Sequence, residues 1–355
     1  MYRIGVIPGD GVGPEVVREG LKVLDRAAEV CGFQYERVEF PWGSDHYLAT
    51  GELLPSSALD ELRRLDAIFL GALGDPRLER GLIERAVLMT IRFELDLYIN
   101  LRPINLYAER LTPLKGVGPV DVDMMVVREN TEDAYVGIGG TLRAGTPQET
   151  AVAEMIYTRP GVERAIRYAF ELASRPDRRQ KVTLVDKSNA IRAQEIWRRA
   201  FADVARDYPA VETDALYVDA TAMWMVTDPA RFDVIVTTNL FGDILTDLGA
   251  AIQGGLGSAA SANIHPGRVS MFEPIHGSAP DIAGQNLASP VGAISAVAMM
   301  LNYLGDVSAS DLIQRSIRDL LKQNQLPGLG VTGLKTNRVG DMVVAQMERL
   351  AGQPA

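Results

Sequence analysis

The chain of 355 residues contains one cysteine, Cys31, so no disulfide can form within it. This excludes the small extracellular domains that depend on disulfide bonds, and it favours a reducing compartment. The chain also lacks an excess of positive charge, because its formal net charge is −10. Proteins that bind nucleic acid need a basic face to neutralise phosphates, so we expect no nucleic-acid partner.

Long apolar runs are missing as well. The longest stretch without a charged residue, residues 282–305, is interrupted by Gln285, Pro290 and Asn302, which predicts buried helix and loop rather than a membrane span. Residues 2–7 read as a strand, in place of a basic segment followed by an apolar signal core. We therefore expect a cytoplasmic protein with no membrane role.

Short runs of β-branched and apolar residues alternate with longer helical patterns along the chain. This alternation predicts an α/β protein with a largely parallel sheet, and the length suggests two domains. The strand runs are residues 4–7, 67–70, 124–127, 182–185 and 234–237. Helical patterns follow the first, fourth and fifth of these runs, at residues 15–30, 190–208 and 240–252. Residues 137–145 are predicted to form an exposed connection of the hairpin type.

A glycine-rich segment, Pro8-Gly-Asp-Gly-Val-Gly-Pro-Glu15, lies between the first strand and the first helix. Gly9, Gly11 and Gly13 permit a tight backbone path, and Pro14 suits the start of a helix. A Rossmann dinucleotide fingerprint would need glycine in place of Pro14, so that interpretation fails. A strand-to-helix turn is favoured here over a ligand-binding loop.

Three arginines could hold an anionic substrate. Arg92 and Arg102 precede Arg128, which directly follows an apolar strand, where parallel sheets present ligand sites. Guanidinium groups pair with carboxylates in a bidentate manner, so converging arginines would bind a dicarboxylate. Each arginine taken alone fits a solvated or salt-bridged surface position equally well.

Two acids four residues apart, Asp243 and Asp247, would share one face of a helix. No lysine or arginine occurs from Phe232 to Gly267, so the two carboxylates lack a counter-charge nearby in sequence. A divalent cation would relieve their repulsion, and Mg²⁺ or Mn²⁺ prefers oxygen ligands. The alternative is a pair of exposed acids that the helix dipole favours near a helix start.

The segment Glu273 to Gly284 combines small residues with His276 and Asp281. Free backbone amides and a histidine can lie against a nucleotide, and an aspartate can accept hydrogen bonds from ribose hydroxyls. No lysine or arginine lies between Val269 and Gln314, so a 2′-phosphate would find no local partner. NAD is therefore expected rather than NADP, although a purely structural loop is the alternative.

Taken together, these segments closely resemble the β-decarboxylating dehydrogenases, which act on isopropylmalate, isocitrate, homoisocitrate or tartrate and D-malate. The resemblance runs from residue 4 to about 305. It implies a two-domain isopropylmalate/isocitrate dehydrogenase-like fold, distinct from Rossmann enzymes. Residues 1–98 plus 252–355 would form a discontinuous cofactor-binding domain, and residues 99–251 a domain for substrate, metal and dimerisation.

The resemblance also assigns expected roles to residues. Tyr135 would be catalytic as a proton donor, and Lys187 as part of the base. A homodimer would share its active sites, because Lys187 and Asp219 would come from the neighbouring subunit. The remaining expected residues are Arg92, Arg102, Arg128, Leu88 and Met89 for substrate, Asp219, Asp243 and Asp247 for metal, and Asn189, His276, Gly277, Ser278, Ala279, Asp281 and Ile282 for cofactor.

The expected reaction is the NAD-dependent, metal-assisted oxidative decarboxylation of a 2-hydroxy dicarboxylate. Leu88 and Met89 offer apolar contact, which fits an isopropyl group and would leave a third carboxylate unpaired. We therefore expect (2R,3S)-3-isopropylmalate as the substrate, 4-methyl-2-oxopentanoate as the product and leucine biosynthesis as the pathway.

The sequence leaves two alternative functions open. The segment Arg128-Glu-Asn-Thr-Glu132 is more similar to isocitrate and tartrate members of the family, so a tartrate or D-malate dehydrogenase is the rival enzyme. The other alternative is a non-catalytic metabolite-binding homologue. That class predicts loss of a metal aspartate, Lys187 or Tyr135, yet all of these residues are present.

Overall fold

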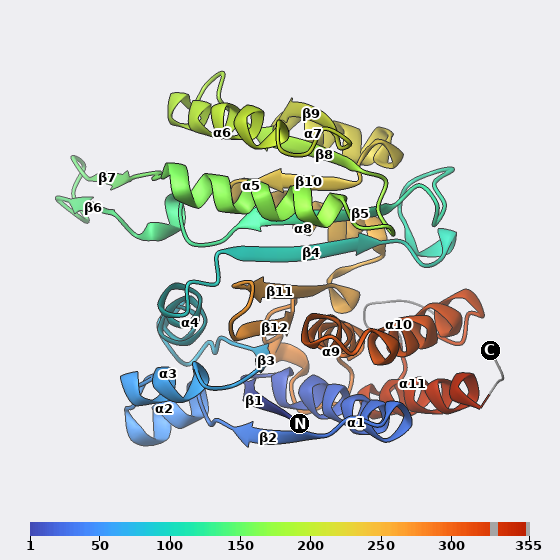
Figure 1. Cartoon of the computed structure of the whole chain (residues 1–355). Helices are drawn as coiled ribbons and strands as arrows, with labels where there is room; N and C mark the ends of the chain where they lie inside the picture. Colours follow the sequence, from blue (N-terminus) through green and yellow to red (C-terminus); the bar gives the residue numbers. More distant parts are fainter. Residues whose placement is uncertain (327–332, 353–355) are drawn as a thin grey trace. The chain divides into compact units, whose positions relative to one another are not determined.

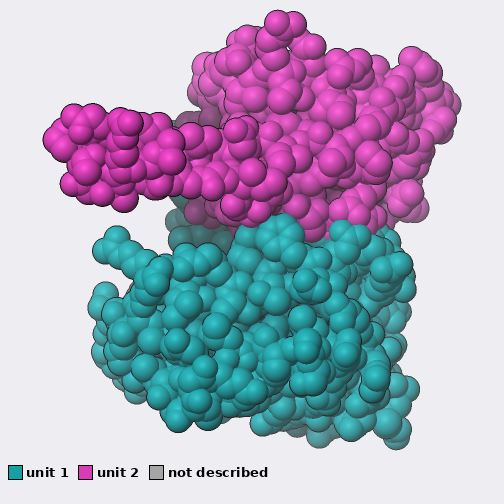
Figure 2. Space-filling view, turned by 90° about the vertical axis from the view of Figure 1, so that its left-hand side faces the viewer, with its two compact units in different colours: residues 1–97, 105–119, 250–355 teal, residues 98–104, 120–249 magenta. Residues whose placement is uncertain are grey.

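The computed structural model describes residues 1–326 and 333–352, and these divide into two compact units. Unit 1 comprises residues 1–97, 105–119 and 250–355, and unit 2 comprises residues 98–104 and 120–249 (Figure 2). Residues 105–119 thus belong to unit 1, whereas the sequence placed them in the second domain. The division of cofactor and substrate binding between the domains stays a prediction.

Unit 1 contains five strands in the order β2-β1-β3-β12-β11 (Figure 1). β1 pairs in parallel with β2 and β3, and β3 with β12, whereas β11 and β12 are antiparallel. The bounds are β1 Tyr2–Gly9, β2 Tyr35–Glu39, β3 Ala67–Ala72, β11 Ala260–Ile264 and β12 Ser270–Pro274. The predicted α/β class with a largely parallel sheet is confirmed.

Helices α1 and α9 pack on this sheet, and α10 and α11 pack against α1 and against each other. In α1, Pro14 occupies the first turn, Val16 and Leu24 lie on the buried face, and Gly32 ends the helix with φ 76°, a conformation that suits glycine. α9 packs on β11, β12 and α1. The bounds are α1 Gly13–Cys31, α2 Ser44–Thr50, α3 Ser56–Leu62, α4 Thr90–Glu94, α9 Val291–Leu304, α10 Val307–Lys322 and α11 Thr336–Ala351.

Unit 2 contains strands in the order β4-β5-β10-β8-β9, in which β10 is parallel to β5 and β8. β10 has the sequence Val-Ile-Val-Thr and is wholly buried, as expected for an inner strand of a covered parallel sheet. The bounds are β4 Ile99–Asn105, β5 Asp123–Glu129, β8 Lys181–Asp186, β9 Glu212–Tyr217 and β10 Val234–Thr237.

Helix α5 packs on β5, β8 and β10 and also contacts α6. The predicted helix over 190–208 is shorter than expected, because Ala190 closes a turn on Lys187 and a 3₁₀ segment precedes α6. The bounds are α5 Arg159–Ala173, α6 Glu195–Ala205, α7 Val218–Thr227 and α8 Asn239–Gln253.

A separate antiparallel hairpin joins β6, Gly139–Leu142, to β7, Thr150–Ala153, and it extends away from α5 (Figure 1). This confirms the hairpin predicted from residues 137–145. Every residue of both strands is exposed, including Leu142 and Val152. Within residues 1–326 and 333–352, no helix combines the length and apolar character that a bilayer crossing requires.

Candidate active site

Asp243 is the centre of a polar cluster in unit 2. It lies one turn into α8, where its Oδ1 accepts a hydrogen bond from Arg128 on β5 and lies 3.6 Å from Nη2 of Arg102 on β4. Both arginines are buried. Burial alone would raise the pKa of Asp243, but the charges of Arg128 and Arg102 and a hydrogen bond from Tyr135 outweigh it, so the pKa is lowered. Asp243 is therefore a carboxylate at neutral pH.

Asp247 lies one helical turn further along α8, on the same face as Asp243, as the spacing predicted. Its Oδ1 is 3.6 Å from Nη1 of Arg102. Burial raises its pKa, and the charge of Asp243 adds to that effect, while Arg102 opposes it. The two acids lack a counter-charge nearby in sequence, as predicted, and the fold brings Arg102 and Arg128 to them from other strands.

Tyr135 contributes a hydroxyl to the same cluster. It lies in a 3₁₀ turn, Ala134–Val136, and its hydroxyl donates to Oδ2 of Asp243 at 2.8 Å. The guanidinium of Arg128 lies over its ring, 5.2 Å from the centroid. Burial and the neighbouring Asp243 carboxylate raise the pKa of Tyr135. Its phenol therefore stays protonated at neutral pH and is able to donate a proton.

Lys187 and Asp219 form a second polar group in unit 2. Lys187 follows β8, and its Nζ lies 2.5 Å from Oδ1 of Asp219, in the first turn of α7. The hydrogen bond and charge of Lys187 lower the pKa of Asp219. Asn189, two residues after Lys187, is exposed. The expectation that Lys187 and Asp219 act in the site of a second subunit stays a prediction.

The chemistry of these donors suits a divalent metal ion, because Asp243 is anionic and Asp247 presents a second carboxylate on the same helix face. Among residues 1–326 and 333–352, however, no group of three or more acidic, histidine or cysteine side chains is placed to hold a metal. A triad of Asp219, Asp243 and Asp247 within one chain is therefore not formed. The metal assignment stays a prediction.

Arg92 belongs to unit 1, whereas Arg102 and Arg128 belong to unit 2. It lies in α4 of unit 1, is buried, and donates to Oε1 of Glu273 at 2.9 Å, an oxygen that also accepts from Asn263. Leu88 and Met89 lie at the end of a π-helical segment, Glu84–Met89, and are partly buried. Helical segments of this type recur at functional sites. The sequence did not identify Glu273 as the partner of Arg92.

The predicted nucleotide loop follows the carboxyl end of β12 in unit 1. Val12 donates its backbone N–H to the carbonyl of Ser278 at 2.8 Å, and a Cβ on Gly11 would lie 2.0 Å from that carbonyl oxygen. The glycine-rich turn therefore supports this loop. Burial lowers the pKa of His276, and its Nε2 has no hydrogen-bond partner within the described parts of the chain. A neutral imidazole with a buried free nitrogen fits contact with a nucleotide.

The rest of this loop is more open. Ser278 is buried, His276 and Ile282 are partly buried, and Gly277, Ala279 and Asp281 are exposed. Ala279 adopts φ 40° in the left-handed region and precedes a short 3₁₀ turn, Pro280–Ile282. The exposed backbone and the Asp281 carboxylate are accessible to a ligand.

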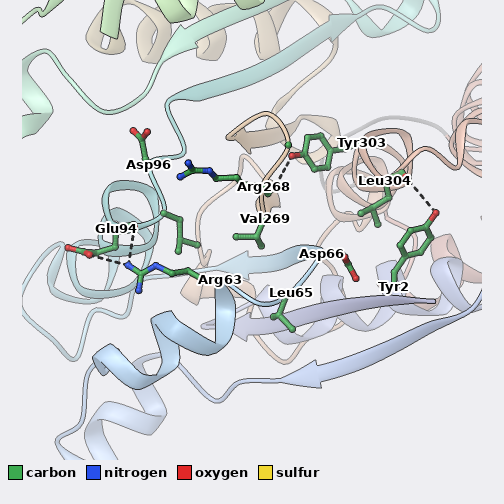
Figure 3. Close-up of a pocket in the computed structure, with 12 residues that line it drawn as sticks. Tyr2, Arg63, Leu65, Asp66, Glu94, Asp96, Arg268, Val269, Tyr303 and Leu304 are labelled. Carbon is green, nitrogen blue, oxygen red and sulfur yellow. Dashed lines mark hydrogen bonds and ion pairs between the residues drawn. The ribbon is translucent and has the colours of Figure 1, made fainter. Parts of the chain in front are cut away.

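A pocket of about 780 Å³ lies elsewhere in unit 1 (Figure 3). Tyr2, Asp66 and Val269 line it, at or just before the amino ends of β1, β3 and β12. Ligands of parallel sheets bind at the opposite, carboxyl ends, where residues 276–282 follow β12. None of the predicted site residues lines this pocket.

Glu129 follows Arg128 and is almost fully buried. Burial raises its pKa to about 7, although hydrogen bonds from Thr131 and Glu132 oppose the change. Its ordinary pKa, about 4.3, applies in the unfolded chain. Between the pKa of about 4.3 in the unfolded chain and the pKa of about 7 in the native protein, the native protein binds more protons than the unfolded chain. The free energy of unfolding should therefore fall as pH rises through this range.

We expect Glu129→Gln to reduce this pH dependence. The wild type should lose on the order of 3 kcal/mol of unfolding free energy at this group between pH 5 and pH 8. Urea unfolding of both proteins at several pH values measures the difference. Curves that run parallel over this range would show that Glu129 does not titrate there.

The family model described as isocitrate/isopropylmalate dehydrogenase matches residues 3–343. A protein named 3-isopropylmalate dehydrogenase from Thermobifida fusca (strain YX) is 50% identical over 349 residues, which are 97% of each chain. A protein of the same name from Mycobacterium avium (strain 104) is 49% identical over 97% of this chain and 100% of its own.

Solved structures are similar as well. The isocitrate dehydrogenase from Methylococcus capsulatus has a TM-score of 0.88 and 37% identity, and the match covers 98% of this chain and 99% of that one. A β-decarboxylating dehydrogenase from Thermococcus kodakarensis in its apo form has a TM-score of 0.79 and 34% identity, over 99% and 97% of the two chains.

Proposed function

Because the chain belongs to the isocitrate/isopropylmalate dehydrogenase family, we propose that it oxidises and decarboxylates (2R,3S)-3-isopropylmalate with NAD and Mg²⁺ or Mn²⁺. The products are 4-methyl-2-oxopentanoate, CO₂ and NADH, in leucine biosynthesis. The observation that carries the substrate is identity near 50% over nearly the whole chain to proteins named 3-isopropylmalate dehydrogenase.

In this proposal, Arg102 and Arg128 bind the substrate carboxylates and Arg92 assists them. Arg102 and Arg128 come from neighbouring strands and already converge on Asp243, so their guanidinium groups are held ready for an anion. Leu88 packs against the apolar core of unit 1, where Met89 also lies half-buried. Both side chains favour an alkyl substituent on the substrate.

The proton transfers fall to two residues. A base that includes Lys187 takes the proton of the substrate hydroxyl as the C2 hydride is transferred, and Tyr135 protonates the enolate that decarboxylation leaves. Asp243 and Asp247, with Asp219, would hold the metal. When bound, such an ion supplies Lewis-acid polarisation of the hydroxyl and then of the 2-oxo oxygen.

The cofactor would lie along residues 276–282, with Asn189 near the nicotinamide. His276 offers a free ring nitrogen, and Asp281 accepts from ribose hydroxyls and disfavours a 2′-phosphate. We further propose a homodimer in which Lys187 and Asp219 complete the partner's site. The cytoplasmic assignment rests on the single cysteine, Cys31.

An absorbance assay at 340 nm tests the function. We expect the highest kcat/KM with 3-isopropylmalate and NAD, in the presence of Mg²⁺ or Mn²⁺, when isocitrate, tartrate, D-malate and NADP are compared. A strong preference for D-malate or tartrate would replace the proposed substrate. Absence of NADH formation with every substrate would support a non-catalytic protein instead.

Leu88→Asn should weaken selection of the alkyl substrate. An amide placed against an isopropyl group loses apolar contact and needs a hydrogen-bond partner, so kcat/KM for 3-isopropylmalate should fall about 10- to 100-fold. The value for D-malate, which lacks the alkyl group, should change much less. An equal fall for both substrates would show that Leu88 does not contact the isopropyl group.

A further inference from the structure

The carboxylate of Asp133 joins the segments that carry the proposed catalytic groups of unit 2. Oδ1 accepts from the backbone N–H of Ala134 at 2.9 Å, at the start of the turn that carries Tyr135. Oδ2 accepts from the backbone N–H of Leu240 at 2.9 Å, in the first turn of α8 and three residues before Asp243. One side chain thus holds both the tyrosine turn and the aspartate helix.

The same carboxylate also reaches the Lys187 segment through the partly buried Tyr157 and the buried Gln194. The hydroxyl of Tyr157 donates to Oδ1 of Asp133 at 2.7 Å, and Nε2 of Gln194 donates to the Tyr157 hydroxyl at 2.8 Å. The backbone N–H of Lys187 donates to Oε1 of Gln194 at 2.7 Å. A continuous chain of hydrogen bonds therefore links Asp133 to the backbone of Lys187.

We infer that Asp133 is a positioning residue, which sets Tyr135 and Asp243 in register with each other and ties both to the Lys187 segment. This inference rests on the proposed function, because that function gives these three residues their chemical roles. None of the atoms of Asp133 needs to touch substrate. Part of its effect passes through the Tyr135 hydroxyl, which donates to Asp243 at 2.8 Å.

The backbone of Asp133 supports the inference independently. Its φ of 70° and ψ of −150° lie in a region that is open to glycine and strained for other residues. Such a conformation persists only where surrounding contacts hold it, and it occurs preferentially at functional sites. The antiparallel bridge between Asp133 and Ile156 and the hydrogen bonds to the carboxylate provide those contacts.

Two substitutions at position 133 distinguish the role of the carboxylate from that of the strained backbone conformation. Asp133→Gly removes the carboxylate and relieves the backbone strain, so the relieved strain offsets part of the stability lost with the hydrogen bonds. Asp133→Asn keeps the shape but turns one accepting oxygen into a donor that faces Leu240 or Tyr157. Asp233→Asn is the matched control, since Asp233 is equally buried, at 1% exposure, and accepts from the backbone N–H of Arg179.

The first measurement needs no substrate and no metal. In protein labelled with ¹³Cζ-tyrosine, the Tyr135 resonance is identified by its loss in Tyr135→Phe. At pH 7, both Asp133 variants should move this resonance toward that of an exposed tyrosine, while Asp233→Asn leaves it in place. An unchanged Tyr135 resonance in Asp133→Gly would overturn the inference.

The second measurement is steady-state kinetics of the full-length protein with NAD and the substrate it prefers. Both Asp133 variants should lower kcat about 10- to 100-fold and leave KM within about threefold. In a Tyr135→Phe background the Asp133→Gly loss should be clearly smaller than in the wild type, because part of its effect passes through Tyr135. A full additional loss in that background, or an equal loss in Asp233→Asn, would also overturn the inference.

The proposed function and the positioning role of Asp133 can be disproved independently of each other. If the wild type oxidises none of the substrates, the proposed function is wrong, and the Tyr135 resonance alone decides the positioning role of Asp133. If the wild type is active and the Asp133 variants match it in kcat and in the resonance, only the positioning role is wrong.

Discussion

Asp243→Asn should lower kcat by roughly 100-fold or more and raise the concentration of Mg²⁺ or Mn²⁺ needed for half-maximal activity. Even groups that only support metal ligands change affinity or activity by about 10- to 100-fold, so a direct ligand should reach at least that range. The substitution removes the negative charge that Arg128 and Arg102 face. It also replaces one carboxylate oxygen, which accepts a hydrogen bond from Tyr135 or Arg128, with an NH₂ group. Initial rates across a metal titration measure both effects.

Asp203→Asn is the matched control for this variant. Asp203 pairs with Arg159 at 2.9 Å, and its side chain is 42% exposed, compared with 41% for Asp243. The control removes an arginine-paired carboxylate of the same exposure from unit 2, and it should leave the metal titration unchanged. If Asp243→Asn behaves like Asp203→Asn, the assignment of Asp243 to the metal is wrong.

Lys187→Met should lower kcat by about 10²- to 10⁴-fold, the range expected for loss of a general base. Methionine keeps an unbranched side chain but cannot accept or carry a proton, and it leaves Asp219 without its partner at 2.5 Å. The oxidation step should be slowed, so NADH forms from 3-isopropylmalate more slowly by the same factor. Decarboxylation of added oxaloacetate-type 2-oxo acids should suffer less, which identifies the blocked step.

Lys181→Met provides the comparison for Lys187. Lys181 lies at the other end of β8, pairs with Glu212 at 2.9 Å, and has a side chain of similar exposure. It should retain activity close to the wild type. Equal losses in the two variants would assign the effect to the stability of β8 rather than to proton transfer.

The strands that the sequence predicted best are the buried inner strands. β10 matches its predicted range, and β3 and β8 are each two residues longer than predicted, because continuous runs of branched apolar residues mark strands that are covered on both faces. β11 was not predicted, since Ala260-Ser-Ala-Asn-Ile264 contains few strand-forming residues although all of them are buried. Its place depends on pairing with β12, which is a tertiary effect.

The sequence pointed to residues of the polar cluster in unit 2 but not to their pairing. The sequence selected Arg102, Arg128 and Asp243, yet it could not show that these arginines supply the counter-charge of α8, because Arg128 and Asp243 are 115 residues apart. Asp133 was missed for a similar reason. In Thr131-Glu-Asp133 it reads as part of a polar surface turn, and only the fold buries it beneath α8.

Unit 1 is discontinuous in sequence, so its sheet cannot be completed until the residues of unit 2 have been synthesised. β3 needs β12 as its neighbour, yet about 200 residues separate Ala72 from Ser270. At the usual rate of synthesis, β3 stays an unpaired edge for roughly 10 to 40 s while all of unit 2 emerges. An apolar edge strand of this kind invites intermolecular pairing, so the nascent chain should depend on chaperone protection during that interval.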